Sequence, residues 1–270
     1  MGYYINVEPT VNLYIEDLNP EGSKTILFLH GWPGSHELFE YQFNQLAPLG
    51  YRCIGLDQRG FGKSDQPMTG YSYDRLSDDV RCLIETLKLH DITLLGHSTG
   101  GSIAVRYMAR HRAYQVKNLV LCAAAAPSLI KRPNFSYGVP KENIEEMITL
   151  TYTDRPQMLQ NFGANFFFQH ISSAMMDWFF QLGLAAAGWA TAEVEKTWIA
   201  EVLFADLEQI LTPTLIIHGI HDKIVPFSLG EIQKKMIRNS LLLPFEFSGH
   251  ATFIDEMDRF NKEVTRFINA

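Results

Sequence analysis

Apolar residues along this chain occur in short continuous runs that alternate with longer stretches of helical period. Continuous runs of this kind are typical of strands buried on both faces of a parallel sheet. In chain order the runs are Thr25–Leu29, Arg52–Leu56, Ile92–Leu95, Val116–Cys122, Thr214–Ile217 and Leu241–Phe247. Tyr3–Val7 and Val11–Asp17 precede them as the two strands of an expected hairpin. The pattern predicts a mostly parallel, eight-stranded sheet.

Helical segments separate the predicted strands. Tyr73–Leu89 is the clearest, because its apolar residues recur every three or four positions and therefore share one face. The other expected helices are Leu38–Leu46, Ile103–His111, Leu229–Ile237 and Phe253–Ile268. Strands that alternate with helices predict an α/β fold in which helices flank the sheet on both faces.

The alternation is interrupted between about Pro127 and Thr212. This part is rich in Phe, Met, Trp and Ala, and it has helix-like stretches without a convincing buried strand. Because the strand–helix pattern resumes at Thr214, we interpret residues 127–212 as an inserted helical lid. Residues 1–126 and 213–270 then form one core domain.

Composition and charge narrow the expected partners. Apolar residues make up 46% of the 270 residues and charged residues 20%, which is ordinary for a globular protein with a substantial core. The net charge of −7, without a basic run, argues against nucleic acid and against an anionic membrane surface. No segment approaches the roughly 20 apolar residues of a membrane span, and no signal peptide is evident. We expect a cytoplasmic monomer or small homo-oligomer.

The cysteines and histidines give no metal signal. Cys53, Cys82 and Cys122 lie in apolar segments without zinc-like spacing, so we expect them to be reduced core residues. No His/Asp cluster has the spacing of metal ligands. The sequence therefore predicts neither a metal nor a cofactor.

The strongest chemical signal is the pentapeptide Gly96-His97-Ser98-Thr99-Gly100, which follows the strand Ile92–Leu95 and precedes a helix. A serine on so sharp a strand-to-helix turn projects its Oγ clear of the backbone. Glycines on both sides let the strand and the helix approach closely. The helix also starts just behind Ser98, so its unpaired N–H groups lie near any negative charge that develops there. This context favours a nucleophilic serine over a plain glycine-rich turn.

Other distinctive clusters follow neighbouring strands and should meet at the same edge of the sheet. They are His30–Gly34, Asp57–Ser64, His218–Asp222 and Ser248–His250. Serine needs a base, and the base needs a partner that fixes its tautomer. His250 is the candidate base and Asp222 the candidate partner, and the order Ser, Asp, His is the one expected with a Ser98-type turn.

The remaining titratable residues near these clusters have less specific interpretations. We expect the His97 side chain to point away from that of Ser98 and to be structural. His221 is a weaker rival to Asp222 and His250 for a catalytic part. Asp255 and Asp258 belong to the last predicted helix, where we expect both to be solvated.

A tetrahedral intermediate needs preorganised donors for its oxyanion, usually two backbone N–H groups. The residue after the nucleophile, Thr99, should supply one of them. Trp32, in the loop after Thr25–Leu29, should supply the other, and its ring could wall an acyl pocket. His30 is expected to shape that loop by local hydrogen bonds. From the strongly apolar lid, Phe166 and Trp189 are the candidates for contact with substrate, together with Trp32.

These residues resemble the α/β-hydrolase superfamily over almost the whole chain. Within it, the chain is similar to the cofactor-free haloperoxidase, perhydrolase and arylesterase branch, which also contains γ-lactamases. The matching segments are His30-Gly31-Trp32-Pro33, Asp57–Ser64, Gly96–Gly101, Arg106–His111, His218-Gly219 and Asp222–Pro226. The chain departs from the branch at Ile220-His221, at Ser248–Ala251 and in the lid from Phe162 to Trp198.

The resemblance implies a fold and a set of roles. Ser98, Asp222 and His250 fall on the catalytic triad, and Trp32 and Thr99 fall on the oxyanion positions. Pro33 falls where some members carry a proline linked to perhydrolysis. Haloalkane dehalogenases and epoxide hydrolases carry aspartate at the position of Ser98, so those activities are set aside.

The sequence therefore predicts a serine carboxylic-ester hydrolase that acts on small to medium, neutral, apolar acyl substrates. Lactones with an acyl tail, such as an N-acyl homoserine lactone, are an alternative, as are perhydrolysis and cyclic amides. Two other classes stay open: a non-catalytic ligand receptor built on a hydrolase fold, and a lyase that uses the same base.

Overall fold

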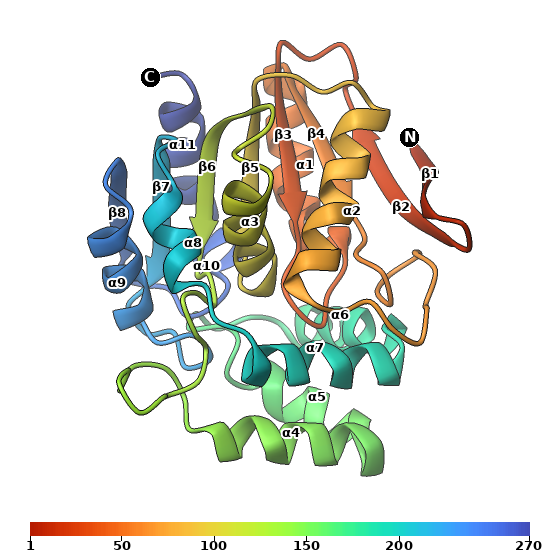
Figure 1. Cartoon of the computed structure of the whole chain (residues 1–270), viewed down its shortest axis with the longest axis vertical. Helices are drawn as coiled ribbons and strands as arrows, with labels where there is room; N and C mark the ends of the chain where they lie inside the picture. Colours follow the sequence, from red (N-terminus) through yellow and green to blue (C-terminus); the bar gives the residue numbers. More distant parts are fainter.

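The structure, a computed structural model, describes residues 1–270 and contains one sheet of eight strands (Figure 1). The strands are β1 (Gly2–Glu8), β2 (Val11–Leu18), β3 (Lys24–Leu29), β4 (Tyr51–Leu56), β5 (Ile92–His97), β6 (Val116–Cys122), β7 (Thr214–Gly219) and β8 (Ser240–Phe245). Their order across the sheet is β1-β2-β4-β3-β5-β6-β7-β8. β2 is antiparallel to both β1 and β4, and every other pair is parallel. The expected mostly parallel, eight-stranded sheet is confirmed.

Helices follow the strands much as expected. The helices of the core are η1 (His36–Phe39), α1 (Glu40–Leu46), η2 (Ala47–Leu49), α2 (Tyr73–Thr86), α3 (Thr99–Arg110), α9 (Ser228–Met236), α10 (Thr252–Asp255) and α11 (Met257–Ile268). α3 begins at Thr99 rather than Ile103, because Ser98 alone makes the turn from β5. The expected last helix is divided at Glu256, whose φ of −128° and ψ of 53° are not helical.

The sheet separates two apolar cores because successive strand residues point to opposite faces. On β3, Leu27 and Leu29 pack into the core beneath α2 and α3, whereas Ile26 and Phe28 pack into the core beneath α1 and α11. All four side chains are fully buried, and burying a side chain of this size contributes about 1.5–3 kcal/mol. The central strands are therefore rigid supports for the loops at their ends.

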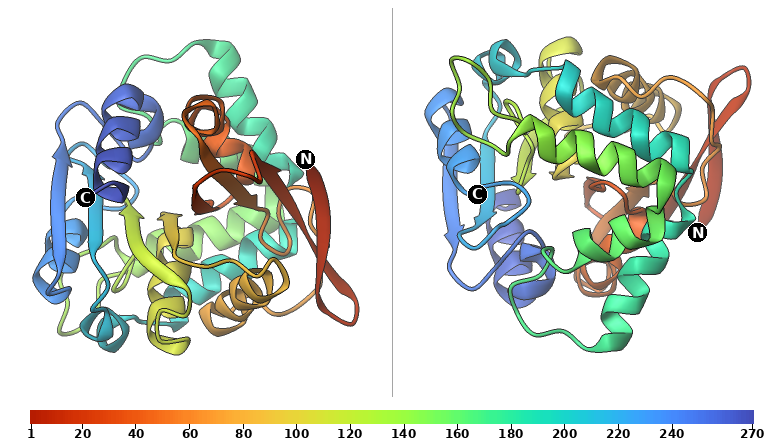
Figure 2. Two further views of the ribbon diagram at one scale, coloured as in Figure 1. Left: turned by 90° about the horizontal axis from the view of Figure 1, so that it is seen from above. Right: turned by 90° about the horizontal axis from the view of Figure 1, so that it is seen from below.

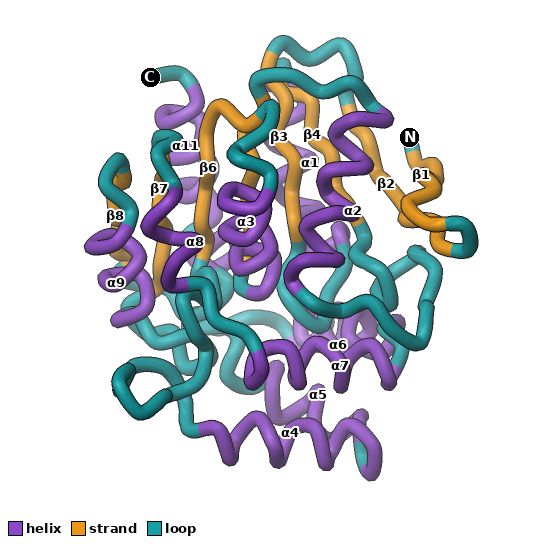
Figure 3. The backbone as a smooth tube through the Cα atoms, in the orientation of Figure 1, coloured by secondary structure: helices purple, strands orange, loops and turns teal.

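The segment between β6 and β7, which we call the lid, contains helices joined by loops and no strand of the sheet, as the tube view shows (Figure 3). Its helices are α4 (Lys141–Thr153), α5 (Arg155–Gly163), α6 (Ser173–Ala185), α7 (Gly188–Ala200) and α8 (Phe204–Gln209). α4–α7 lie across the carboxyl ends of the parallel strands, which is clearest from below (Figure 2, right). α8 instead packs beside α3 on a face of the sheet. None of the helices combines the length and the apolarity needed to cross a bilayer.

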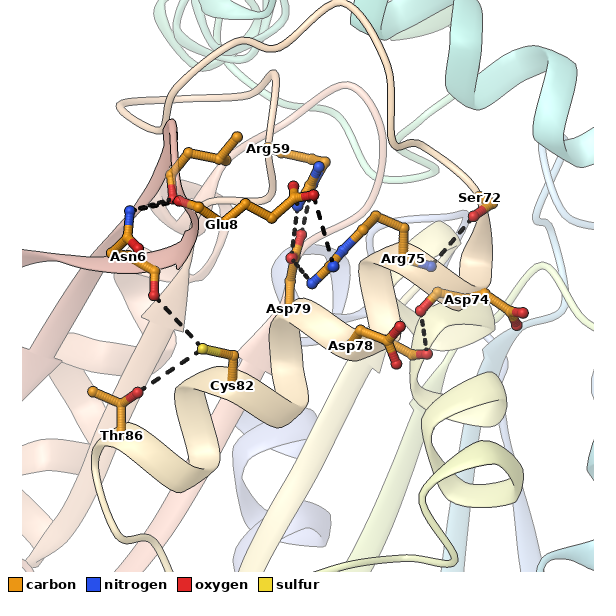
Figure 4. A network of polar contacts seen from close by, with 12 residues as sticks. Asn6, Glu8, Arg59, Ser72, Asp74, Arg75, Asp78, Asp79, Cys82 and Thr86 are labelled. Carbon is orange, nitrogen blue, oxygen red and sulfur yellow. Dashed lines mark hydrogen bonds and ion pairs between the residues drawn. The ribbon is translucent and has the colours of Figure 1, made fainter.

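The loop after β4 is held by buried charges. The Arg59 guanidinium is 1% exposed and makes two hydrogen bonds of 2.7 Å to the Asp79 carboxylate on α2 (Figure 4). It also contacts Glu8 of β1 at 2.6 Å, and Arg75 shares the Asp79 carboxylate at 2.7 Å. Removing one partner from such a buried pair leaves an uncompensated charge, so the network fastens this loop to the core.

The cysteines are all free thiols, but they do not share one environment. Cys53 and Cys122 are buried in the core, and burial raises the pKa of each thiol to about 12. Cys82 is only half-buried, on α2, with its sulfur 3.6 Å from the Asn6 carbonyl oxygen (Figure 4). The expectation that all three are core residues is wrong for Cys82, because its position on α2 faces the β1 edge.

The interior of the lid contains one acidic side chain. Glu195 of α7 is fully buried, and the hydroxyl of Thr151 on α4 lies 3.3 Å from both of its carboxyl oxygens. Burial raises the pKa of Glu195 from 4.5 to about 8, against smaller opposing effects of Thr151 and Lys196. Between pH 4.5 and 8 the folded chain therefore holds a proton that the unfolded chain has lost, and stability falls as pH rises through this window.

Glu195→Gln removes this ionisation while keeping the shape of the side chain. We expect thermal unfolding of wild type and variant to agree at pH 5. At pH 8.5 the free energy of unfolding of the variant should be larger by on the order of 2 kcal/mol. Wild type loses stability at this pH because its buried carboxyl group must either ionise in the core or stay protonated at a pH where the unfolded chain has lost the proton. Glu142→Gln, at an exposed position of α4, is the matched control and should show no such divergence. If wild type and Glu195→Gln differed in stability by the same amount at both pH values, the raised pKa of Glu195 would be contradicted.

Candidate active site

Ser98 is the only residue between β5 and α3, and its backbone is held in an unusual conformation. Its φ of 53° and ψ of −118° are adopted rarely by residues with a side chain. The neighbouring chain fixes this geometry: the Ser98 N–H donates to the Cys122 carbonyl of β6 at 2.9 Å, and the Ser98 carbonyl accepts from the Ala125 N–H at 3.1 Å. The strain is therefore supported by β6 and by the loop that follows it.

Glycine is required on both sides of this turn. A Cβ atom on Gly100 would collide with the carbonyl oxygen of Leu29, at the end of the adjacent strand β3. A Cβ atom on Gly96 would collide with the carbonyl oxygen of Gly100. The first turn of α3 can thus approach the sheet only because both positions lack a side chain.

His250 and Asp222 meet at the carboxyl ends of β7 and β8. The distance from His250 Nδ1 to Asp222 Oδ2 is 2.7 Å, and both side chains are fully buried. The other oxygen, Asp222 Oδ1, accepts the backbone N–H groups of Ile224 at 2.9 Å and Val225 at 2.8 Å. His218 Nε2 lies 3.5 Å from Oδ2. The carboxylate is thus surrounded by groups that favour its charged form.

The charge on Asp222 determines the proton arrangement of His250. Burial alone would raise the pKa of this carboxyl group, but His250 and His218 hold it well below its usual range. An ionised Asp222 accepts the proton on His250 Nδ1, which leaves Nε2 as the basic nitrogen. His250 Nε2 is buried and has no hydrogen-bond partner within the protein. The imidazole is therefore prepared to take a proton.

The loop that carries His250 is fastened to the lid. The backbone N–H of His250 donates to the Phe166 carbonyl at 3.0 Å, and the Phe166 ring packs edge-on against the imidazole with centroids 5.2 Å apart. Asp255 accepts the N–H groups of Gly249 at 2.8 Å, Phe168 at 3.0 Å and Gln169 at 3.0 Å. One carboxylate thus joins the His250 loop to the segment between α5 and α6.

The expectation that Asp255 is solvated is therefore wrong. Asp255 ends the short helix α10, just before the chain departs from helical geometry at Glu256, and its carboxylate turns back toward the preceding loop. Burial raises the pKa of Asp255. Asp258, on the next helix, is exposed as expected.

The other histidines near the site have separate placements. His97 is fully buried, and its Nε2 donates to the His250 carbonyl at 3.1 Å. Burial, followed by the nearby His250, holds the pKa of His97 well below its usual value. His221 is exposed and stacks on Phe168 with ring centroids 3.9 Å apart. It does not line the cavity that contains Ser98.

His30 shapes the loop after β3. Its Nε2 accepts the Gln58 N–H at 3.0 Å, and its Nδ1 lies 3.0 Å from the Gly31 carbonyl oxygen. Burial lowers the pKa of His30 to about 4, so the ring is neutral. These bonds hold the Gly31 backbone close to the site, since a Cβ atom on Gly31 would lie 2.9 Å from Ser98 Cβ.

Trp32 and Thr99 each offer a free backbone donor near Ser98. Thr99 is the first residue of α3, so its N–H is one of those that a helix leaves unpaired. Neither this N–H nor that of Trp32 donates to another group of the protein. Trp32 lies in the loop after β3 and lines the same cavity as Ser98, and Thr99 directly follows Ser98 at the start of α3. An oxyanion requires two such preorganised donors.

A cavity of about 380 Å³ opens between the lid and the core, with Ser98 in its wall. Its apolar lining consists of Trp32, Leu129, Val139, Ile144, Met147, Leu150, Met158, Phe162, Trp198 and Ile224. Its polar lining consists of Asn143, Glu146, Asn161, Asn165 and Lys223 besides Ser98. These five polar residues are exposed, whereas the ten apolar ones are buried or half-buried, so the cavity has an apolar interior and a polar mouth.

The structure does not bring Phe166 or Trp189 into the cavity. Phe166 is fully buried behind His250. Trp189 is 37% exposed, and its indole N–H donates to the Pro67 carbonyl at 3.1 Å. The lid aromatic residues that do line the cavity are Phe162 and Trp198. Helical spacing could have indicated Trp198, because it lies on one face with the buried residues Ala190 and Val194, whereas Trp189 is rotated away from them.

No group of three or more His, Cys, Asp or Glu side chains is close enough together to hold a metal ion. The loops at the carboxyl ends of the parallel strands instead carry a hydroxyl (Ser98), an imidazole that contacts a buried carboxylate (His250 and Asp222), and the backbone N–H groups of Trp32 and Thr99. Such a set can deprotonate the hydroxyl and stabilise an oxyanion.

Comparison with known proteins shows which family and which chains this protein resembles. Residues 24–257 match the family profile described as alpha/beta hydrolase fold. The AB hydrolase superfamily protein YisY of Bacillus subtilis is 43% identical over 270 residues, covering 100% of both chains. The bifunctional esterase/perhydrolase DCH of Acinetobacter calcoaceticus is 28% identical and covers 99% of each chain. A solved esterase from Exiguobacterium antarcticum superposes with a TM-score of 0.97 at 38% identity, covering 100% of both chains.

Because Asp222 holds the proton of His250 on Nδ1, Nε2 is free to act as a base, and we expect the Ser98 hydroxyl to be reactive. A fluorophosphonate probe should label Ser98, as read by peptide mass spectrometry, and Ser98→Ala should not be labelled. Asp222→Asn should slow the labelling by roughly 10²–10⁴-fold, because His250 loses the partner that fixes its basic nitrogen. Asp258→Asn, an exposed acid on α11, is the control. Labelling of Asp222→Asn at the wild-type rate would contradict the arrangement.

Proposed function

The chain belongs to the α/β-hydrolase family, and on that premise we propose that it is a serine carboxylic-ester hydrolase acting on small to medium, neutral, apolar acyl groups. The observation that carries this proposal is the buried Asp222–His250 hydrogen bond of 2.7 Å, which leaves His250 Nε2 unpartnered. It is supported by the position of Ser98 in the wall of an apolar cavity.

The proposed reaction has two acyl-transfer steps. Ser98 Oγ attacks the ester carbonyl carbon while His250 Nε2 takes its proton, and the N–H groups of Trp32 and Thr99 stabilise the oxyanion. His250 returns the proton to the leaving alcohol, and an acyl-enzyme forms. Water then attacks the acyl carbon with the same base, which releases the acid and restores Ser98. Asp222 stabilises the imidazolium in both steps.

The cavity supports the choice of acyl group. Its apolar interior offers no cation to an acid-bearing acyl chain, because the one basic lining residue, Lys223, is at the exposed mouth. Transfer of a carboxylate into such a lining without a partner is costly. A volume of about 380 Å³ is in the range of small-molecule sites, so chains of moderate length fit. Lactones of similar size meet the same requirements.

Ester turnover tests the proposal directly. We expect p-nitrophenyl butyrate to be hydrolysed with multiple turnovers and p-nitrophenyl hemisuccinate, of similar length but charged, to have a kcat/KM lower by at least about tenfold. Ser98→Ala should abolish turnover, and His250→Ala should lower kcat by about 10²–10⁴-fold or more. Circular dichroism should show that both variants are folded.

Undiminished hydrolysis by Ser98→Ala would show that Ser98 is not the nucleophile. A different result would favour a ligand receptor. In that case a fluorophosphonate would label wild type, but esters, lactones and lactams of graded size would not be turned over repeatedly.

Perhydrolysis is a second candidate activity. It is favoured by Pro33, which follows the oxyanion residue Trp32, and by the name of the Acinetobacter relative, a bifunctional esterase/perhydrolase. In this reaction hydrogen peroxide replaces water in the attack on the acyl-enzyme, so the products are a peracid and free Ser98.

We expect wild type to form peracetic acid from ethyl acetate and hydrogen peroxide, and Ser98→Ala to form none above the uncatalysed rate. Peracid is measured by oxidation of a chromogenic substrate after the enzyme has been removed. Hydrolysis of the ester without any peracid would restrict the chain to water as acyl acceptor.

A further inference from the structure

A lid residue reaches the turn that carries the nucleophile. The indole Nε1–H of Trp198, on α7, donates to Thr99 Oγ1 at 3.1 Å. Both residues are buried, Trp198 being 5% and Thr99 1% exposed. Thr99 follows Ser98 directly, and its backbone N–H is one of the two proposed oxyanion donors. The hydrogen bond therefore joins the lid directly to a residue of the proposed oxyanion hole, and it does not depend on bound substrate.

The second oxyanion residue is tied to the same helix. The indole Nε1–H of Trp32 donates to the Thr191 carbonyl of α7 at 3.2 Å. The Trp32 and Trp198 rings pack edge-to-face, with centroids 5.1 Å apart and an interplanar angle of 77°. Two indole hydrogen bonds and one aromatic contact thus connect both donor residues to one helix.

Helix α7 is itself attached firmly to the core. Just before its first turn, the Ala187 N–H donates to the Gly60 carbonyl at 2.9 Å. Near its end, Thr197 Oγ1 donates to the Tyr71 carbonyl at 3.0 Å. A residue of the lid itself, Arg132, also holds this end: its guanidinium donates to the carbonyl of Ile199 at 2.9 Å, where the helix leaves its last carbonyl groups unpaired. α7 is therefore a fixed support, although it belongs to the lid.

From these contacts we infer that Trp198 is a positioning residue for the oxyanion hole: its indole N–H holds the Thr99 hydroxyl and thereby the orientation of the Thr99 amide. The inference rests on the proposed function. It assigns α7 a part in transition-state stabilisation, in addition to its part in lining the cavity.

The physical reason lies in the strain at Ser98. Oxyanion donors act only if they are aimed in advance, and small displacements weaken them. The Thr99 amide is in the first turn of α3, where a helix leaves N–H groups without a helical partner, and it directly follows a residue of unfavourable backbone geometry. Helix bonds from this N–H therefore do not hold its orientation. Anchoring the Thr99 side chain from α7 limits the motion of this peptide.

Substitutions that remove either side of the bond test the inference. Thr99→Val keeps the shape of the side chain and removes the acceptor, at a residue that does not line the cavity. We expect kcat for p-nitrophenyl butyrate to fall by about tenfold with KM changed less than about twofold, because only the transition state carries an oxyanion. Thr99→Ser keeps the hydroxyl and should retain most of kcat. Trp198→Phe should reproduce the loss in kcat.

The double variant Thr99→Val/Trp198→Phe should lose no more kcat than Thr99→Val alone, since both substitutions remove one interaction. Binding of a trifluoromethyl ketone, which forms a tetrahedral oxyanion adduct with Ser98, should weaken in parallel with kcat. Trp178→Phe, on α6, is the matched tryptophan control and should leave kcat unchanged. Replacing Trp198 with its benzothiophene analogue removes the N–H in a side chain of equal shape, and it serves if Trp198→Phe does not fold.

The outcomes separate this inference from the proposed function. Unchanged kcat in Thr99→Val, or a change confined to KM, would overturn the positioning role while ester hydrolysis by wild type stands. Losses in kcat that multiply in the double variant would also overturn it, because the two residues would then act independently. Absence of ester turnover in wild type would instead overturn the proposed function.

Discussion

The buried negative charge of Asp222 is the constraint on which the rest of the site depends. Removing a carboxylate from water is costly unless each oxygen is matched by donors. His250, His218 and the backbone N–H groups of Ile224 and Val225 meet this requirement. They can do so only if β7 and β8 end side by side, so the parallel sheet determines where the base can lie. The tautomer of His250 follows from the charge on Asp222, and so does the proposed role of His250 as the base for Ser98.

Contacts from both the lid and the core hold the residues of this site in position. His250 is held from the lid by the Phe166 carbonyl, and Asp255 joins its loop to the segment between α5 and α6. Trp32 and Trp198 connect the oxyanion side to α7. A lid of this kind closes the cavity and also sets the orientation of the groups beneath it. Changes in lid sequence between related proteins can therefore alter rate as well as substrate choice.

The sheet could be predicted from strand order, and so could the placement of Ser98, Asp222 and His250 after strands that end at one edge of it, because parallel strands run in the same direction. The direction of lid side chains could be predicted only in part. Helical spacing separates Trp198, which shares a face of α7 with buried residues, from Trp189. That this face borders the cavity depends on how α7 packs, which the spacing does not give. The contacts of Asp255 do not follow from helical spacing either, because the helix is interrupted at Glu256 and the Asp255 carboxylate accepts backbone N–H groups of two loops.

The contrast between the apolar interior of the cavity and its polar mouth has a consequence for the end of the proposed catalytic cycle. The proposed reaction consumes a neutral molecule and produces an anion at physiological pH. The apolar walls that admit the neutral molecule cannot solvate the anion, whereas Lys223 and the asparagines at the rim can. Product departure is thus driven by the same polarity gradient that selects what enters, and accumulated acid should inhibit the enzyme only weakly.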